Sequence, residues 1–221
     1  MAPSLAERYQ AVQAGLRPGV TLVAVSKTRT ADEIRALYEL GQRDFGENYP
    51  QELREKAPQL PDDIRWHFIG HLQRSNVKHV VPVVHLIHGV DSLRLAEEID
   101  KRAAAAGRAV DILLQVHIAR EETKHGLSPD ELRDAVRSWP WSAWPHLRLC
   151  GLMGMASNTD DRDQVRREFE GLKQLFDDMG ADARPAGAFN TLSMGMSGDA
   201  DLAQAAGSTL VRIGTALFGP R

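Results

Sequence analysis

The sequence contains a single cysteine, Cys150, so no disulfide can form within the 221-residue chain. This excludes a disulfide-stapled secreted fold and gives no indication of an oxidising compartment. Long apolar runs are also missing: no stretch approaches the roughly 20 apolar residues that a membrane-spanning helix requires. The first residues, Met-Ala-Pro-Ser-Leu-Ala-Glu-Arg, lack the charged and apolar regions of a secretory signal. We therefore expect a cytoplasmic protein without membrane contact.

Neither sign of charge is in large excess. The 27 Lys and Arg residues stand against 30 Asp and Glu residues, which gives a net charge of −3. Because there is no basic surplus, nucleic-acid binding is not expected. Hydrophobic residues make up 43% and charged residues 26%, as in ordinary globular proteins. No linker or low-complexity segment divides the chain, and its length suits one domain over residues 1–221.

Short apolar strands alternate with amphipathic helices along the chain. The expected strands are Val20–Ser26, Arg43–Gly46, Arg65–Ile69, Val84–His88, Asp111–His117, Leu147–Met153, Ala188–Leu192 and Thr209–Ile213. Helices are expected over residues 3–16, from Thr30 to Gly41, from Asp91 to Gly107, from Ser128 onward, from Arg162 to Met179, and over Gly198–Ala206. Continuous Val, Ile and Leu runs in several strands are typical of a parallel sheet buried on both faces.

Eight strand–helix units of about 28 residues each predict an α/β fold, a single-domain (β/α)8 TIM barrel. The competing fold is a doubly wound open sheet, which is disfavoured because no Gly-x-Gly-x-x-Gly follows the first strand. Only Thr215–Arg221 follow the last strand, too few for a full closing helix. We expect the helix that precedes the first strand, over residues 3–16, to take that place.

Lys27 is the only one of the six lysines directly after a predicted strand. The others fall on helices (Lys56, Lys78, Lys101, Lys173) or in the loop after the fifth strand (Lys124). At the mouth of an apolar barrel, a lysine loses hydration, which lowers its pKa. The neutral amine can form a Schiff base with an aldehyde. The alternative is a solvated loop lysine.

A phosphate site is indicated at the ends of the last two strands. Ser193-Met-Gly-Met-Ser197 and Arg212-Ile-Gly-Thr215 supply glycines and hydroxyls where TIM barrels commonly bind phosphate, aided by a helix N-terminus. Ordinary turns are the alternative. A Schiff-base lysine beside a phosphate site predicts a phosphorylated aldehyde, and pyridoxal 5′-phosphate (PLP) is the commonest cofactor of that kind. Other polar or sulfur-bearing strand ends are Glu47, Asn48, Tyr49, His67, His71, Asp91, His117, Met153 and Met155.

Seven segments resemble the pyridoxal phosphate homeostasis proteins, the YggS/PROSC family, whose fold is similar to the barrel of alanine racemase. They are Leu22-Val-Ala-Val-Ser-Lys-Thr28, Phe45-Gly-Glu-Asn-Tyr49, Trp66-His-Phe-Ile-Gly-His-Leu-Gln73, Glu121-Glu-Thr-Lys-His-Gly126, Gly151-Leu-Met153, Leu192-Ser-Met-Gly-Met-Ser197 and Gly207-Ser-Thr-Leu-Val-Arg-Ile-Gly-Thr-Ala-Leu-Phe-Gly219. They cover nearly the whole chain in order. Departures are Ser75-Asn76, where the family commonly has Asn-Lys, and His117, where it often has Asn.

The resemblance implies roles for ten cofactor-binding residues. Lys27 carries the PLP aldimine, Asn48 lies beside the cofactor ring, and Arg212 faces the pyridine nitrogen. Ser197, Gly214 and Thr215 match the phosphate site. Ser193, Met196, His67 and Met153 are expected to form the pocket wall.

An arginine facing the pyridine nitrogen limits the expected chemistry. A guanidinium cannot accept a proton, so it keeps that nitrogen unprotonated and weakens the ring as an electron sink. Alanine racemases also supply a tyrosine base from a second domain, which this chain is not expected to have. The resemblance therefore favours a non-catalytic PLP carrier or regulator in PLP homeostasis. We expect it to act as a monomer, with PLP-dependent apoenzymes as recipients.

Two other functions stay open at this point. One is a PLP-dependent enzyme of small scope, such as an amino-acid racemase. The other is an aldolase-like Schiff-base enzyme, which would use Glu47 or Asp91 as the acid or base. No metal site is expected, since His67 and His71 fall on a strand end and its loop and not on one helix face. Cys150 is expected to be a buried structural thiol.

Overall fold

The structure is a computed structural model that describes residues 3–121, 125–180 and 189–219. Its eight strands are parallel and close into one barrel in chain order, from β1 next to β2 round to β8 next to β1. The strands are β1 Thr21–Val25, β2 Asp44–Glu47, β3 Arg65–Phe68, β4 Val84–Val90, β5 Val110–Val116, β6 Leu147–Gly154, β7 Thr191–Ser193 and β8 Leu210–Ile213. The predicted TIM barrel is confirmed, and the open sheet is wrong.

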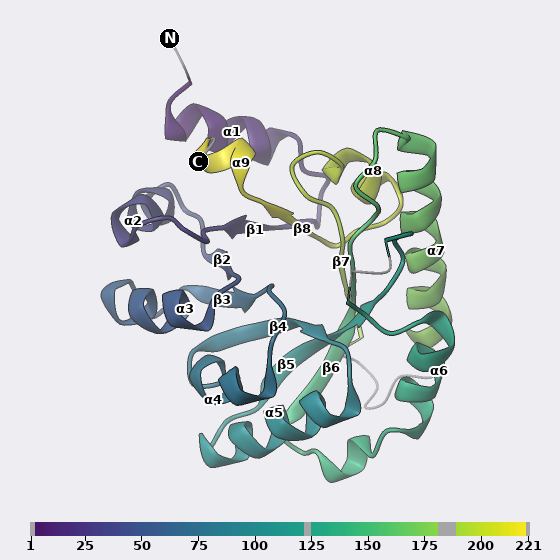
Figure 1. Cartoon of the computed structure of the whole chain (residues 1–221). Helices are drawn as coiled ribbons and strands as arrows, with labels where there is room; N and C mark the ends of the chain where they lie inside the picture. The colour runs from purple at the N-terminus through teal and green to yellow at the C-terminus, as the bar shows by residue number, and fades with distance from the viewer. Residues whose placement is uncertain (1–2, 122–124, 181–188, 220–221) are drawn as a thin grey trace.

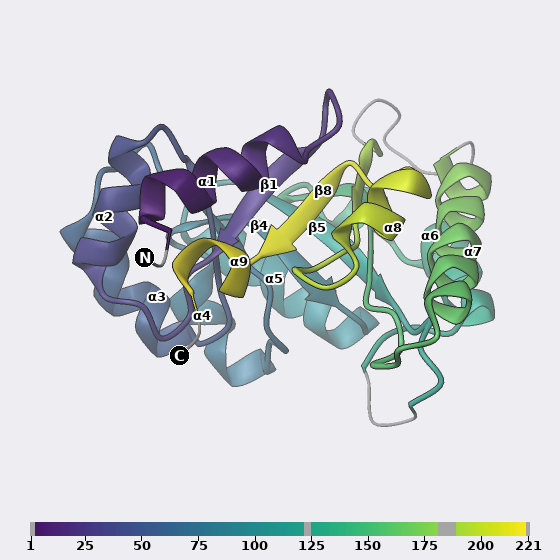
Figure 2. The ribbon, with the colours of Figure 1, turned by 90° about the horizontal axis from the view of Figure 1, so that it is seen from above.

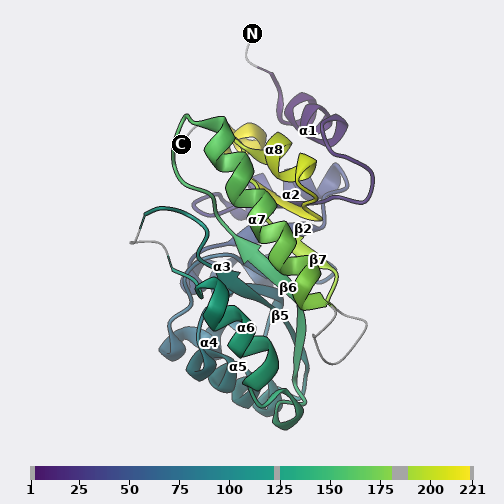
Figure 3. The ribbon, with the colours of Figure 1, turned by 90° about the vertical axis from the view of Figure 1, so that its right-hand side faces the viewer.

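Helices surround the strands on all sides (Figure 1). They are α1 Leu5–Ala14, α2 Ala31–Glu39, α3 Pro50–Lys56, α4 Val77–Val80, α5 Leu93–Ala105, α6 Pro129–Ser138, α7 Arg162–Gly180, α8 Ala200–Ala205 and α9 Thr215–Phe218, with 3-10 turns at Ala57–Gln59, Arg74–Asn76 and Trp141–Ala143. Capping boxes at Thr30 and Ser128 begin α2 and α6, the two residues at which these helices were expected to start. Figure 3 shows α6 and α7 running along the side of the barrel formed by β6.

Many element bounds differ from the expectation by one or two residues; β4, for example, ends at Val90 instead of His88. The seventh strand ends at Ser193 instead of Leu192, and the expected start at Ala188 lies outside the described residues. The short helices α3 and α4 had no predicted bounds. A one-turn helix, α9, follows the last strand and packs beside α1 next to β1 and β8 (Figure 2). The N-terminal helix thus completes the ring together with α9, because α9 alone is too short to cover two strands.

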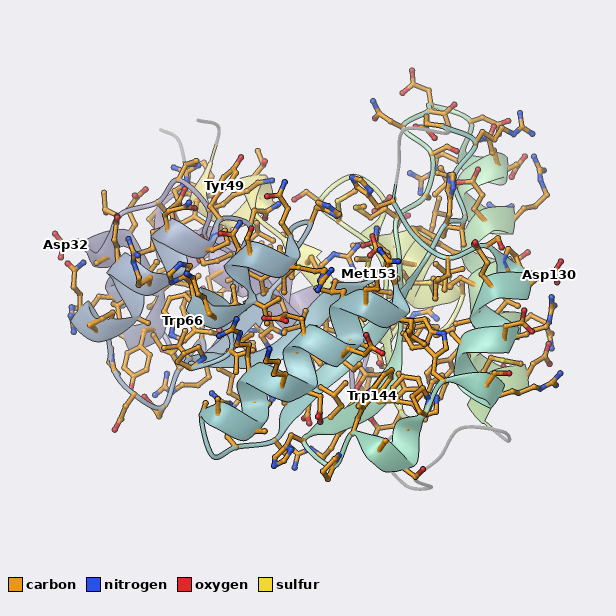
Figure 4. All side chains as sticks on the ribbon, turned by 60° about the horizontal axis from the view of Figure 1, so that its bottom comes forward. Asp32, Tyr49, Trp66, Asp130, Trp144 and Met153 are labelled. Carbon is orange, nitrogen blue, oxygen red and sulfur yellow. The ribbon has the colours of Figure 1, made fainter. Side chains whose placement is uncertain are left out.

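Two apolar cores result from the alternation of side chains along the strands. The larger core lies between the strands and the helices and includes the fully buried Phe45, Phe68 and Phe169. The smaller core draws residues from strands all around the barrel, so it lies inside: Val23, Leu86, Leu113, Cys150, Met153 and Leu210. Figure 4 shows Met153 near the middle of the molecule, whereas Asp32 and Asp130 project from its periphery. Burial raises the pKa of the Cys150 thiol to about 12, in keeping with a structural role.

The described part of the chain offers no helix with the length and apolar character needed to cross a bilayer.

Candidate functional site

A cavity of about 320 Å³ opens at the carboxyl ends of the strands. Its lining comes from β1, β8 and the loops after β1, β2, β3, β6 and β7: Val25, Lys27, Arg29, Asn48, Ile69, Met155, Met196, Ser197, Gly198, Arg212, Gly214 and Thr215. The volume falls in the range of small-molecule sites, roughly 300–1,000 Å³. Seven of the ten predicted site residues line it: Lys27, Asn48, Met196, Ser197, Arg212, Gly214 and Thr215.

The turn that carries Lys27 is held from beneath by a buried ionic cluster. Lys56 Nζ donates to the Ser26 carbonyl oxygen at 3.0 Å and pairs with Glu47 Oε1 at 2.9 Å. Glu52 accepts from the Thr28 backbone N–H at 2.7 Å and also pairs with Lys56. The residues on both sides of Lys27 are therefore anchored to α3, which fixes the point from which its side chain enters the cavity.

Thr28 has a backbone φ of 64°, the only described non-glycine residue with a positive φ. A β-branched residue pays a steric penalty there, of about 1–3 kcal/mol. Strain of this kind, next to a candidate reactive lysine, is typical of a functional site.

Replacing Thr28 by glycine should relieve this strain. We expect Thr28→Gly to raise the free energy of unfolding by about 1 kcal/mol, since the relief exceeds the added freedom of glycine in the unfolded chain. Urea unfolding followed by circular dichroism measures the change. Thr28→Val keeps the branched side chain and should give no gain; equal gains in both variants would contradict the strain.

Hydroxyl and glycine residues line the other side of the cavity, where β7 and β8 lead into α8 and α9. Ser197 and Thr215 contribute hydroxyls, and Gly198 and Gly214 contribute backbone. A Cβ on Gly214 would lie 3.3 Å from Val25 Cβ, so a side chain there would crowd the β1 wall of the cavity. The first N–H groups of a helix have no acceptor within the helix, which leaves those at the start of α9 available to an anion.

Arg212 brings a buried positive charge to the cavity. It is 4% exposed, and its Nη1 donates to Ser193 Oγ at 2.5 Å while Nη2 donates to the Gly154 carbonyl oxygen at 3.1 Å. Burial lowers the pKa of Arg212 to about 10, which still leaves the guanidinium protonated at neutral pH. The cavity thus combines a lysine amine with a fixed cation that can donate hydrogen bonds and cannot accept them.

Asn48 supplies an observation that points to a ligand. Its side-chain oxygen Oδ1 is buried, and no described group hydrogen-bonds to it. Since buried polar atoms are nearly always paired, an unpaired one on a cavity wall is suited to a bound polar molecule. The donor set fits PLP: an amine for the aldehyde, hydroxyls and glycines for the phosphate, and an arginine for the ring nitrogen.

Three predicted wall residues are not among those that line the cavity. His67, Ser193 and Met153 are at most 2% exposed and lie inside the barrel. Met153 belongs to the apolar interior. His67 bonds to Asp44 and His88, and His88 bonds to Ser193, which is in turn bonded to Arg212. Position at a strand end does not tell whether a side chain points up into the mouth or inward below it.

The stability of the protein at acid pH should depend on Asp44, which lies at the amino end of β2 and bonds to His67 inside the barrel. Burial acts to raise its pKa, but hydrogen bonds from His67 and Arg65 outweigh burial and lower the pKa to about 2. The folded pKa lies below the unfolded value of roughly 3.9, so the stabilisation is complete above that pH and is lost as pH falls toward 2. We expect Asp44→Asn to lose up to about 2 kcal/mol at neutral pH and to flatten this dependence.

Urea unfolding between about pH 2 and pH 7 tests the Asp44 prediction. Asp130→Asn is the matched control, since the Asp130 side chain is 94% exposed. An unchanged acid profile in Asp44→Asn would show that the Asp44 contacts do not stabilise the fold.

The acid and base groups of the aldolase reading are not at the cavity. Glu47 is fully buried against Lys56 and Ser26, and burial raises its pKa. Asp91 lies instead near His71, with its Oδ2 at 3.8 Å from His71 Nδ1. Neither lines the cavity that contains Lys27. Among the described residues, the cavity lining includes no carboxylate and no tyrosine.

His71, Asp91 and His125 form a cluster whose nitrogen and oxygen atoms lie within 4.8 Å of one another. The two imidazole rings are stacked, with centroids 3.9 Å apart and planes 13° from parallel. Imidazole lone pairs lie in the ring planes, so rings stacked in this way do not point at one ion. We assign no metal to this cluster.

Four residues of the cavity lining were not among the predicted site residues: Val25, Arg29, Ile69 and Gly198. Arg29 could have been predicted from the sequence, because it is a cation in the loop after β1, two residues beyond Lys27. Its Nη2 donates to the Gly219 carbonyl oxygen at 2.7 Å, and its guanidinium lies 5.4 Å from the Phe218 ring centre. Arg29 therefore joins the first loop to the C-terminal helix α9 at the edge of the cavity. Met155 appeared among the strand ends without a role.

The chain was compared with known families and proteins. The family described as alanine racemase, N-terminal domain, matches residues 2–221. A pyridoxal phosphate homeostasis protein of Aquifex aeolicus is 39% identical over 201 residues, covering 90% of this chain and 86% of the relative. The human protein of that name is 40% identical over 210 residues, covering 90% and 76%.

Solved structures show the same likeness. PipY of Synechococcus elongatus PCC7942, with PLP bound, superposes with a TM-score of 0.88 at 35% identity, over 98% of this chain and 100% of PipY. Without PLP, the TM-score is 0.92 at 36% identity. Alanine racemase from Bartonella henselae gives 0.74 at 17% identity over 58% of its length, which shows a shared fold only.

Proposed function

We propose that this chain, which belongs to the pyridoxal phosphate homeostasis family, binds PLP in the cavity at the carboxyl ends of its strands. We further propose that it acts in PLP homeostasis as a carrier or regulator. The observation that carries the proposal is that Lys27, Arg212 and the hydroxyls of Ser197 and Thr215 all line one cavity. The PLP-bound relative PipY supports it, since 98% of this chain superposes on that structure.

Each group has a definite part in holding the cofactor. Lys27 would supply the amine that holds the aldehyde group of PLP. Ser197, Gly198, Gly214 and Thr215 would bind the phosphate through hydroxyls and backbone N–H groups. Arg212 would donate to the ring nitrogen and, because it cannot take a proton back, would keep that nitrogen unprotonated.

Binding without turnover is the function that this lining supports best. A racemase needs an acid or base on the second face of its substrate. Tyr49, the tyrosine nearest a strand end, is 50% exposed and lies outside the cavity lining. We therefore infer a non-catalytic protein that passes PLP to apoenzymes and acts as a monomer.

The deciding experiment uses PLP-free protein. PLP should bind one to one and give a visible absorption band. When the loaded protein is mixed directly with a PLP-dependent apoenzyme, the activity of that apoenzyme should be restored. Incubation of the loaded protein with a panel of L-amino acids should leave their chirality unchanged. Racemisation would establish the enzyme reading, whereas failure to bind PLP would remove the function altogether. Size-exclusion chromatography with light scattering should give the mass of one chain.

A further inference from the structure

We propose that Ser193 and His88 are positioning residues that hold Arg212 in place through a one-way hydrogen-bond chain across the barrel interior, anchored on Asp44 at the opposite end. That Arg212 faces the ring nitrogen of PLP rests on the proposed function. The hydrogen-bond chain rests only on contacts within the protein.

The chain has four links between Arg212 and Asp44. Arg212 Nη1 donates to Ser193 Oγ at 2.5 Å, and Ser193 Oγ lies 2.9 Å from His88 Nδ1. His88 Nε2 lies 2.9 Å from His67 Nδ1, and His67 Nε2 lies 3.0 Å from Asp44 Oδ1. The three distances that involve histidine nitrogens are those of ordinary hydrogen bonds, and the Arg212–Ser193 contact is shorter.

The path runs through the barrel, not around it. His88 is on β4 and Ser193 on β7, and β5 and β6 separate these strands in the sheet. Their contact therefore crosses the interior. Asp44 and its partner Arg65 begin β2 and β3 at the amino end of the barrel, whereas Arg212 lines the cavity at the carboxyl end. TIM-barrel interiors are normally filled by branched apolar side chains, so this polar series departs from ordinary packing.

The direction of the chain follows from what each group can donate. Arginine only donates, so Ser193 Oγ accepts from Arg212 and has one hydrogen to give. No described acceptor other than His88 Nδ1 lies within reach of that hydrogen. A neutral His88 then carries its proton on Nε2 and donates to His67 Nδ1. His67 carries its proton on Nε2 and donates to the Asp44 carboxylate.

The charges around the chain agree with this assignment. Burial lowers the pKa of His88 well below its usual value, and the positive charge of the nearby Arg212 acts in the same direction, which keeps His88 neutral. Asp44 is ionised, as its low pKa requires. His85 also faces the chain, with its ring centre 5.7 Å from that of His67, and burial lowers its pKa too. A neutral His88 therefore lies between the Arg212 cation at the cavity and the Asp44 carboxylate, which is paired with Arg65.

Arg212 gains a fixed orientation from this arrangement. Of the five N–H groups of its guanidinium, one bonds to Ser193 and one to the Gly154 carbonyl oxygen, which leaves others for the cavity. Without the bond to His88, the Ser193 hydroxyl would be free to rotate, and the guanidinium that donates to it would be free to turn. The chain thus determines how the cation is presented to a ligand.

The first arm of the test needs no cofactor. Nitrogen-15 NMR of uniformly labelled, PLP-free protein should show both His67 and His88 neutral with the proton on Nε2. A charged His67, or a proton on Nδ1 of either ring, would overturn the one-way chain, whatever the protein binds.

The second arm compares Ser193→Ala, His88→Leu and His88→Gln with the unchanged protein. Glutamine keeps one acceptor and one donor, so it can continue the chain, whereas leucine cannot. The readout is the pH midpoint of the absorption band of bound PLP. A freed Arg212 would let the ring nitrogen take a proton, so Ser193→Ala and His88→Leu should lower the midpoint by about one pH unit, and His88→Gln should restore it.

The outcomes separate the two proposals. If the unchanged protein binds no PLP, the proposed function fails. The NMR result then still decides whether the hydrogen-bond chain runs in one direction. If PLP binds and all variants titrate alike, the function stands and the positioning role is wrong. If His88→Leu does not fold, Ser193→Ala still decides, since a purely structural role would leave its midpoint unchanged, and His88→Gln remains the control that should titrate like the unchanged protein.

Discussion

Lys27→Ala should abolish the covalent attachment of PLP. The alanine side chain has no amine, so borohydride reduction should leave no PLP-modified peptide, and the visible band of the linked cofactor should disappear. Phosphate and ring contacts remain at Ser197, Thr215 and Arg212, so weak binding should persist. We expect affinity to fall by at least about 100-fold, equivalent to about 2.7 kcal/mol. Peptide mapping and equilibrium dialysis measure the two effects.

Lys101→Ala is the control for this variant, because Lys101 is exposed on α5, away from the cavity. It should behave like the unchanged protein. Lys56 is the other lysine near the turn, but its amine is buried and bonded to Ser26, Glu47 and Glu52. A reduced adduct on any lysine in the Lys27→Ala protein would show that the attachment site has been misassigned.

Gly151→Ala should cause the largest loss of stability. Gly151 lies in β6 with a φ of 149°, where the pairing with β5 shifts register. A Cβ added there would lie 1.8 Å from the Thr191 carbonyl oxygen, a backbone atom of the neighbouring strand. Because backbone cannot move aside as a side-chain tip can, β6 and β7 would have to separate. We expect a loss of about 3–5 kcal/mol in the free energy of unfolding.

Gly171→Ala is the matched control. Gly171 lies in the exposed middle of α7, and nothing is within 4 Å of an added Cβ. Alanine is the better helix former, so this variant should gain about 0.5–1 kcal/mol. Urea unfolding gives both values. A Gly151→Ala protein as stable as the unchanged one would mean that the strands relax at this point without cost.

Much of the fold could be read from the sequence because its signals are local. Apolar runs such as Asp111-Ile-Leu-Leu-Gln-Val predicted strands. The capping box at Thr30 and the N-cap Ser128 before Pro129 predicted helix starts, since these signals depend on neighbours in the chain. The bounds of α4 were not predictable from such signals, because it is a single turn without a side-chain cap. The Thr191–Ser193 strand is only three residues long, and its pairing partners determine its bounds.

The candidate site divided in the same way. Lys27, Asn48, Arg212 and the phosphate-side residues were predicted from strand ends and from family resemblance, and they line one cavity. His67 and Ser193 were assigned to the wall but lie below it, because a strand-end position does not determine the direction of a side chain in a barrel. His88 was not singled out at all. Its partners are 21 and 105 residues away along the chain, so no local pattern could reveal them.

The sequence by itself determined the class of fold, the family, and the lysine and glycine-rich segments that predict a PLP site. Each of these depends on residue type and on spacing along the chain. Closure of the barrel decided the rest: which strand-end residues share a cavity, how α3 anchors the Lys27 turn, and how Asp44 is joined to Arg212. These features arise from contacts between distant segments, whose geometry exists only once all eight strands have paired.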